Sequence, residues 1–278
     1  MTNIESSLKL DLLAVAPHPD DAELSVGGIL AASVAKGHRV GVLDLTAGEL
    51  GTQGTVELRK SEAAAATKAL GLEYRGNLGL PDGRIAHNGD SAEGLPQLQK
   101  LVAKFRELSP RVLLLPYWRE RHPDHVAASE LATMAVFYAG LAKFHDGTNG
   151  SLTGGSKGNT SVFRPTAVFY YQLRELFRPS FIVDISSVVK QKEEAISCFA
   201  SQVVKEKNAP KDVISGATLL TSELAQSSRK ARDQFYGAMI GVSAGEPLLS
   251  KGAIGISDPI AHFGANPMTN ALFFPEET

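Results

Sequence analysis

This sequence has very little cysteine and a net charge close to zero. Cys198 is the single cysteine among 278 residues, so no disulfide can form within the chain and a zinc site built from several thiolates is excluded. The 28 Lys and Arg residues nearly balance the 30 Asp and Glu residues, which leaves a formal net charge of −2 and no overall positive field for a polyanion. We therefore expect no nucleic-acid partner, and any bound metal must take His, Asp or Glu ligands.

Long apolar runs are also lacking. The longest candidate, residues 131–142, is shorter than the roughly 20 residues that a membrane span needs. Residues 1–21 carry acidic side chains around one short apolar run, which differs from the pattern of a signal peptide. Because 43% of the residues are hydrophobic and 21% are charged, the composition is that of a globular protein. We expect a cytoplasmic protein with no membrane partner.

Strand-like and helix-like segments alternate over the first half of the chain. Short apolar runs predict strands, and apolar residues at helical spacing predict helices. The predicted strands are 10–16, 39–46, 74–80 and 112–118, and the predicted helices are 21–36, 56–70, 94–108 and 126–144. Such alternation is typical of a parallel sheet with helices on both faces. We predict a doubly wound, Rossmann-like α/β fold with a mostly parallel sheet.

The second half of the chain has fewer regular patterns. Residues 145–162 are rich in Gly, Ser, Thr and Asn and predict a mobile surface loop. Beyond the loop we predict strands at 167–173 and 181–185, helices at 188–203 and 222–241, and an irregular tail. These strands are too few for a second sheet, so residues 163–278 are expected to complete the single domain that residues 1–144 begin. Two roles stay open for the loop, a lid over a pocket or part of a homo-oligomer interface.

Two clusters of His and Asp follow predicted strands. Pro17–Asp21 has the sequence PHPDD, and Arg121–His125 has the sequence RHPDH. In a doubly wound sheet of order 3-2-1-4-5 the strands before them are neighbours, and ligands bind in the crevice outside their carboxyl ends. Turn and helix-cap chemistry explains either cluster alone about as well. Two clusters at adjacent strand ends, however, predict one pocket that can bind a divalent metal.

The longer segments around these clusters add a family resemblance. APHPDDAELSVGG (16–28) and HPDH (122–125) resemble the two motifs of the PIG-L/LmbE-like zinc deacetylases, which remove the acetyl group from N-acetylglucosamine (GlcNAc) attached to another group. The resemblance extends through 46–66 and 77–85 and, more weakly, 245–259. GELGTQGT and LPDG are most similar to members that act on GlcNAc-malate in bacillithiol biosynthesis. The resemblance implies a hydrolase whose partner is a small-molecule GlcNAc conjugate; GlcNAc-inositol and chito-oligosaccharides are the alternatives.

The resemblance also implies roles for five residues in the two clusters. By position, it implies that His18, Asp21 and His125 bind zinc. Asp20 would be the general base, and His122 the cationic partner of the developing oxyanion and the leaving amine. Three protein ligands leave a position open for water, as catalytic zinc sites require, and Fe²⁺ or another divalent metal suits the same ligands. The alternative, a non-catalytic metal-dependent binding module, gives no role to the free carboxylate of Asp20.

Four residues outside the metal set are candidate substrate contacts. The resemblance suggests that Arg59 and Asp82 reach sugar hydroxyls or an anionic aglycone, and that Glu49 orients Arg59 or a hydroxyl. Arg121 is placed for a bidentate contact with a carboxylate. The simpler interpretations are a solvated helix charge for Arg59 and a turn former for Asp82. Asp124 is expected to be structural, because a first-turn carboxylate complements the helix dipole.

Overall fold

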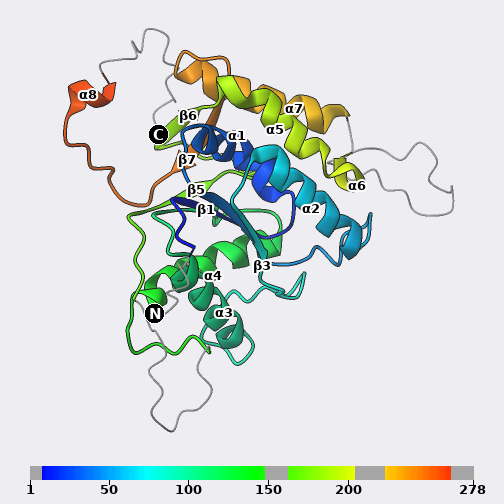
Figure 1. Cartoon of the computed structure of the whole chain (residues 1–278), viewed down its shortest axis with the longest axis vertical. Coiled ribbons are helices and arrows are strands. Elements are labelled where there is room, and N and C mark those ends of the chain that lie inside the picture. Colours follow the sequence, from blue (N-terminus) through cyan, green and yellow to red (C-terminus); the bar gives the residue numbers. More distant parts are fainter. Residues whose placement is uncertain (1–7, 148–161, 204–222, 264–278) are drawn as a thin grey trace, which may run out of the picture.

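One seven-stranded sheet organises the molecule (Figure 1). The computed structural model describes residues 8–147, 162–203 and 223–263. The strand order is β3-β2-β1-β4-β5-β7-β6; the first five of these are parallel, and β7 pairs antiparallel with both β5 and β6. The strands are β1 (Leu12–Ala16), β2 (Val40–Asp44), β3 (Tyr74–Asn77), β4 (Val112–Pro116), β5 (Ala167–Tyr171), β6 (Phe181–Asp184) and β7 (Gly245–Leu249). The predicted mostly parallel sheet and its 3-2-1-4-5 order are confirmed.

Helices cover both faces of this sheet. Figure 1 shows α3 and α4 on one face and α1, α2, α5 and α7 on the other. The helices are α1 (Asp21–Ala35), α2 (Val56–Leu70), α3 (Gly94–Leu108), α4 (Pro123–Ala139), α5 (Val189–Ser197), α6 (Ala200–Val203), α7 (Glu223–Met239) and α8 (Pro259–Phe263), with a short 3-10 turn at Ser186–Val188. None of the helices within the described ranges has the length and apolar character to cross a membrane.

Strand β1 explains why the predicted strands are almost continuously apolar. Its five residues are all buried. Leu13 and Val15 pack into the core beneath α3 and α4, whereas Leu12 and Ala14 pack beneath α1 and α2. Because successive side chains point to opposite faces, a strand with helices on both sides needs apolar residues at every position.

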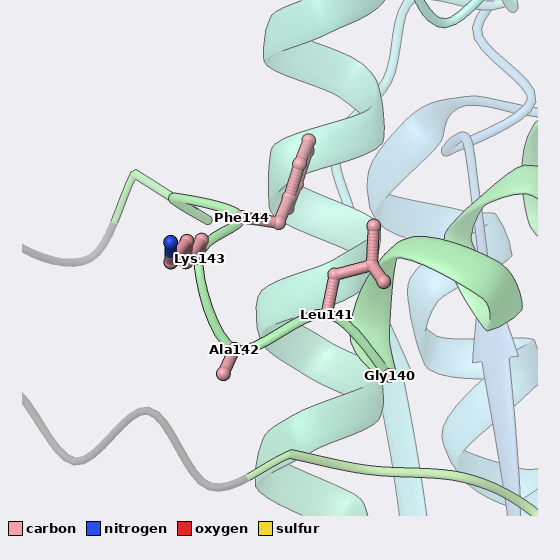
Figure 2. Close-up of a pocket in the computed structure, with 5 residues that line it drawn as sticks. All are labelled: Gly140, Leu141, Ala142, Lys143 and Phe144. Carbon is pink, nitrogen blue, oxygen red and sulfur yellow. The ribbon is translucent and has the colours of Figure 1, made fainter.

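Helix α4 differs from its prediction at both ends. It starts at Pro123 rather than residue 126, because proline is favoured in the first turn, where its missing N–H costs nothing, and His122 caps it. It stops at Ala139 rather than residue 144. The following segment, Gly140–Phe144, lines an open hollow of about 420 Å³ (Figure 2). Carbonyl oxygens of Ala139, Leu141 and Phe144 accept hydrogen bonds from the Arg106 guanidinium, which holds this segment out of the helix.

The carboxyl-terminal part of the chain also differs from its predicted secondary structure. The predicted irregular tail contains β7 and α8, and the helix predicted at 188–203 is divided into a 3-10 turn, α5 and α6. Strand β7 was missed because Pro247 and Gly245 are atypical of a strand. Pro247 is accommodated because β7 pairs with β6 at this position but with β5 only at Leu248 and Leu249. The loop predicted at 145–162 falls mostly on residues 148–161, outside the described residues.

Helix α1 is kinked where β7 contacts it. Val26 has non-helical angles (φ −130°, ψ 16°). The freed N–H groups of Gly28 and Ile29 donate to the carboxylate of Glu246 at 2.9 and 2.7 Å. The same carboxylate lies 2.9 Å from Nζ of the buried Lys192. A strand residue therefore caps the second part of α1, and the first part, which opens with Asp21, forms a separate turn.

Candidate metal and substrate site

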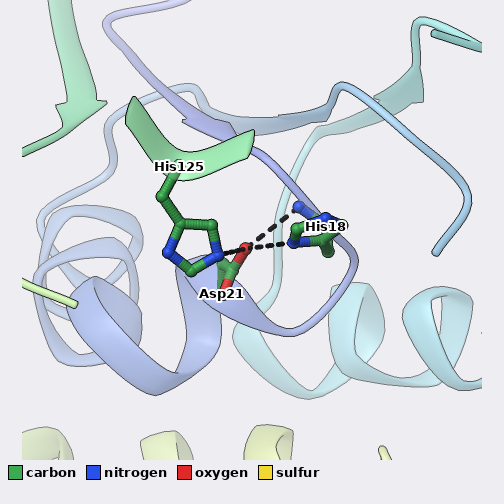
Figure 3. Close-up of side chains that lie close together, drawn as sticks. All are labelled: His18, Asp21 and His125. Atoms are coloured by element: carbon green, nitrogen blue, oxygen red, sulfur yellow. Dashed lines mark hydrogen bonds and ion pairs between the residues drawn. The ribbon is translucent and has the colours of Figure 1, made fainter. Parts of the chain in front are cut away.

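The two His clusters meet at the carboxyl ends of β1 and β4 (Figure 3). His18 follows β1, Asp21 opens α1, and His125 lies in the first turn of α4. Asp21 Oδ2 is 3.2 Å from His18 Nδ1 and 3.4 Å from His125 Nε2. The three ligand atoms all lie within 4.8 Å of one another. The strand order thus brings together side chains more than 100 residues apart, as predicted from the switch point.

The donor set and its spacing fit a divalent metal. Two imidazoles and one carboxylate are ordinary zinc ligands, and metal–ligand distances of about 2.0–2.2 Å in a tetrahedron imply about 3.3 Å between ligand atoms. The two distances from Asp21 Oδ2, 3.2 and 3.4 Å, bracket that value. All three residues are at most 9% exposed. These residues could therefore hold a metal with little rearrangement.

Carboxylates surround the opposite edge of the His18 ring. Its Nε2 is 3.1 Å from Asp82 Oδ1 and 3.3 Å from Asp124 Oδ2. Burial alone lowers the pKa of His18, but hydrogen bonds to Asp124, Asp21 and Asp82 raise it to about 12. This anionic environment favours a cation. A metal-binding imidazole is commonly oriented by a carboxylate on its other nitrogen, which is the place that Asp82 and Asp124 occupy.

Asp20 lies beside the candidate ligands without being one of them. It occupies the N-cap position of α1 but makes no side-chain cap hydrogen bond, so the helix-cap interpretation is wrong here. Its φ of 113° is strained for a residue other than glycine, and such strain clusters at functional sites. Burial and then the charge of Asp21 raise the pKa of Asp20 to about 8, against the opposing effect of Arg59. Because burial and the charge of Asp21 oppose its ionisation, this carboxyl group accepts a proton more readily than an exposed aspartate does.

His122 is more exposed and stands at the edge of the imidazole cluster. Its ring centroid is 5.0 Å from that of His18 and 4.7 Å from that of His125. Its Nδ1 accepts a hydrogen bond from the backbone N–H of Asp124 at 3.2 Å. This bond assigns the proton of the ring to Nε2. Burial and then the charges of His125 and His18 lower the pKa of His122. The geometry therefore favours a neutral imidazole over the predicted cation.

Asp124 has a larger role than the predicted complement to a helix dipole. Its side chain is buried, and Oδ2 accepts from the N–H of Gly83 at 2.7 Å while also approaching His18. Oδ1 accepts from Ile85 N at 3.4 Å. Asp124 thus fixes the loop after β3 against α4 and orients His18 at the same time.

Asp82 and Glu49 join two loops at the rim of the site. Asp82 Oδ2 accepts from the backbone N–H of Leu50 at 2.8 Å, and Glu49 Oε1 accepts from the N–H of Asp82 at 3.0 Å. The other oxygen of Glu49 accepts from Ala47 N at 3.1 Å. Within the described ranges Glu49 makes no hydrogen bond or ion pair with Arg59, so its predicted orientation of Arg59 is not seen here. Asp82 is more than a turn former, because its other oxygen contacts His18.

Arg59 points into the site, whereas Arg121, the residue before His122, is exposed. Arg59 is 7% exposed, so the solvated-charge interpretation is wrong. Its guanidinium donates to Gly48 O at 3.3 Å and to Asp20 Oδ2 at 3.4 Å, and a Cβ on Gly48 (φ 69°) would lie 1.8 Å from it. The guanidinium of the exposed Arg121 makes no hydrogen bond or ion pair with the part of the chain that the structure describes.

A buried ionic cluster behind the site has no counterpart in the predictions. Arg75 of β3 donates to both carboxylate oxygens of Asp44 at 2.8 and 3.0 Å and also contacts Glu23 of α1. Burial raises the pKa of Asp44 to about 6, although Arg75 opposes the shift. The cluster links β2 and β3 to the turn that carries Asp21. No sequence pattern signals it, because each residue alone is an ordinary polar residue.

The fold and the site together define a class of protein. A doubly wound sheet brings together, at its switch point, two imidazoles and a carboxylate whose spacing suits a divalent metal, with the buried carboxyl group of Asp20 beside them. The chain belongs to the PIG-L family, because the family model described as GlcNAc-PI de-N-acetylase matches residues 13–136 and the relatives below support it. The named relatives place it among the N-deacetylases, which hydrolyse acetamides.

Two relatives support this assignment, and a solved structure shares the fold. The chain is 30% identical to a diacetylchitobiose deacetylase of Thermococcus kodakarensis, over 69% of each chain. It is 33% identical to a 1D-myo-inositol 2-acetamido-2-deoxy-alpha-D-glucopyranoside deacetylase of Saccharomonospora viridis, over 45% of this chain and 57% of the relative. The structure of the conserved protein TT1542 from Thermus thermophilus is similar, with 42% identity, a TM-score of 0.70 and coverage of 89% of this chain and 97% of that chain.

Proposed function

We propose that the protein is a metal-dependent deacetylase of a GlcNAc conjugate and that GlcNAc-malate is its favoured substrate. The observation that carries the proposal is the position of Asp20. This buried carboxyl group is adjacent to three convergent ligand atoms, yet it belongs to neither the ligand set nor a helix cap. A protein that only binds the metal has no use for this carboxyl group. A structural zinc site is also commonly closed by four protein ligands, whereas three converge here.

The side chains divide the chemistry among them. His18, Asp21 and His125 would hold the metal, zinc or another divalent ion, which when bound supplies a Lewis acid and lowers the pKa of water. Asp20 would accept a proton from the attacking water at its carboxylate and return it to the leaving amine. Such proton transfer is typically worth about 10²- to 10⁴-fold in rate. Arg59, 3.4 Å from Asp20 Oδ2, would hold that carboxylate in place.

His122 would act as a hydrogen-bond donor in this reaction. Because its Nδ1 accepts from the Asp124 backbone, its Nε2–H is the group available to the oxyanion that forms from the acetyl carbonyl. A preorganised neutral donor is sufficient for such stabilisation. This revises the cationic role implied by the family resemblance and keeps His122 in the catalytic set.

The aglycone is the least constrained part of the proposal. GlcNAc-malate is favoured by the sequences at 48–55 and 80–83, and its two carboxylates need nearby positive charge, which Arg59 and Arg121 can supply. Both oxygens of Asp82 are engaged with His18 and Leu50, so Asp82 would position His18 as well as border the sugar. The inositol conjugate and diacetylchitobiose, which the relatives are named for, are the competing substrates.

Amine release tests the proposal. Protein stripped of metal with a chelator would be reloaded with Zn²⁺, Fe²⁺, Co²⁺ or Mn²⁺ in turn and incubated with GlcNAc-malate, GlcNAc-inositol, diacetylchitobiose and free GlcNAc. We expect activity only after metal is restored, with the highest kcat/KM on GlcNAc-malate. Full activity in the metal-free protein would refute the metal dependence, and equal rates on free GlcNAc would refute the preference for malate.

A further inference from the structure

Arg229 of α7 has a guanidinium whose buried N–H groups lack acceptors. Its Nε and Nη1 atoms are buried, and no described residue accepts a hydrogen bond from either. Burial lowers the pKa of Arg229, although the charges of Glu193 and Asp233 oppose the shift. A buried charged donor without an acceptor is costly. The side chain is therefore prepared for an anionic partner that the described residues do not supply.

Arg229 lies on the part of α7 that contacts the start of α1. One helical turn further along α7, the guanidinium of Arg232 donates to the carbonyl oxygen of Leu24 at 2.7 Å, and Leu24 lies in the first turn of α1. Residues three apart share a helix face, so Arg229 lies on the side of α7 that meets the turn opened by Asp20. Asp20 is among the charges that act on Arg229. Figure 1 shows α7 on the same side of the sheet as α1 and α5.

The buried cations near Arg229 differ from it in having acidic partners within the protein. Lys192 pairs with Asp233 and Glu246, and Arg232 pairs with Asp233 at 3.3 Å. Arg59, on the other side of Asp20, contacts it and still has a buried Nε with no acceptor among the described residues. Two arginines with unmet N–H groups therefore lie on either side of the start of α1: Arg59 of α2 contacts Asp20, and Arg229 lies on α7 one turn before Arg232, which contacts Leu24.

We propose that Arg229 binds an acidic group, a carboxylate or a phosphate, on the aglycone of the substrate and so determines specificity. This inference rests on the proposed function, in which Asp20 acts at the acetamide end of the conjugate. Arginine suits such a partner because its planar array of donors matches the oxygens of both anions. The anion would satisfy N–H groups that are otherwise buried without acceptors.

Calorimetric binding of small anions tests the proposal independently of turnover. The probes are malate and glycerol phosphate, titrated separately into the metal-loaded full-length protein. The matched variants are Arg229→Gln and Lys230→Gln, since Lys230 is an exposed neighbour whose loss changes net charge equally. We expect Arg229→Gln to weaken the better probe at least 10-fold and Lys230→Gln to change it less than 2-fold. The better probe distinguishes a carboxylate from a phosphate, and equal binding by all three proteins would overturn the proposal.

Kinetics and stability separate recognition from a structural role. On GlcNAc-malate, Arg229→Gln should raise KM at least 10-fold with kcat within 3-fold, while the neutral methyl glycoside of GlcNAc should be unaffected; Arg229→Lys should recover part of the loss. Thermal melting of Arg229→Gln should be unchanged or higher, because Nε and Nη1 make no hydrogen bond within the protein that the change would remove. An equal loss on both substrates, or a lower melting temperature, would overturn the proposal. Absence of turnover on every conjugate would instead refute the proposed function, leaving the binding result to decide the role of Arg229.

Discussion

Glu246→Gln should destabilise the protein more than any ordinary change of a surface glutamate. Glu246 is fully buried and accepts from the N–H groups of Gly28 and Ile29 and from Lys192. Glutamine has the same shape but turns one acceptor into a donor. One of the two backbone N–H groups then loses its acceptor, and Lys192 loses one of its two carboxylate partners.

The magnitude follows from these contacts. A buried donor left unsatisfied costs about 1–3 kcal/mol, and removing one partner of a buried ion pair costs about 3–5 kcal/mol. Since Lys192 keeps Asp233 as a partner, only part of the cost of breaking the ion pair applies. We expect the free energy of unfolding to fall by about 3–5 kcal/mol.

Urea denaturation at pH 7 measures this loss. The matched control is Glu57→Gln, because Glu57 is exposed on α2 and should change the free energy of unfolding by less than about 1 kcal/mol. If Glu246→Gln behaved like the control, the capping of the α1 kink by β7 would not stabilise the fold as the geometry indicates.

Three further changes test separate parts of the site. Gly48→Ala should lower kcat/KM at least 10-fold, because the new Cβ would lie 1.8 Å from the Arg59 guanidinium; steady-state kinetics would show this, and unchanged kinetics would refute it. Asp124→Asn should weaken metal binding by about 10- to 100-fold through loss of the carboxylate behind His18, as measured by chelator competition; wild-type affinity would refute it. Asp44 has its pKa raised by burial from 3.8 to about 6, so the folded state holds a proton there that the unfolded state loses first, and its contribution to stability falls as the pH rises through this window. Asp44→Asn removes that dependence. Between pH 4 and pH 7 the free energy of unfolding of the variant should therefore rise relative to that of the wild type by about 2 kcal/mol, whereas a pH-independent difference in urea denaturation would refute the prediction.

The part of the fold that could be predicted has strong local patterns. Leu12 to Ala16 are apolar at every position because both faces of β1 are covered, and α2 lies between Thr55, whose Oγ1 accepts from Leu58 N at 3.1 Å, and Gly71 with φ of 70°. Strand β7 has no such pattern. Its Glu246 is buried only because the α1 kink and Lys192 surround it, and those partners are distant in the sequence.

The site divides in the same way. The meeting of the two His clusters could be predicted because each follows a strand whose place in the sheet is fixed by the alternation of elements, whereas the choice of His18, Asp21 and His125 as ligands came from the family resemblance. The hydrogen bonds of Asp82 and Asp124 to His18 could not, because they depend on how the loop after β3 packs against α4. The same holds for Arg229, whose place depends on α7 packing on β7 and on the hydrogen bond from Arg232 to Leu24 O.

The most direct test of the metal site and its base compares metal content with amine release in three proteins. Wild type, Asp20→Asn and His125→Ala would be loaded with Zn²⁺, desalted, analysed for bound metal and assayed on GlcNAc-malate. We predict about one metal ion per chain in wild type and Asp20→Asn, loss of at least 100-fold in kcat for Asp20→Asn, and loss of both metal and activity for His125→Ala. Near wild-type kcat in Asp20→Asn, or full metal content in His125→Ala, would contradict the proposed roles.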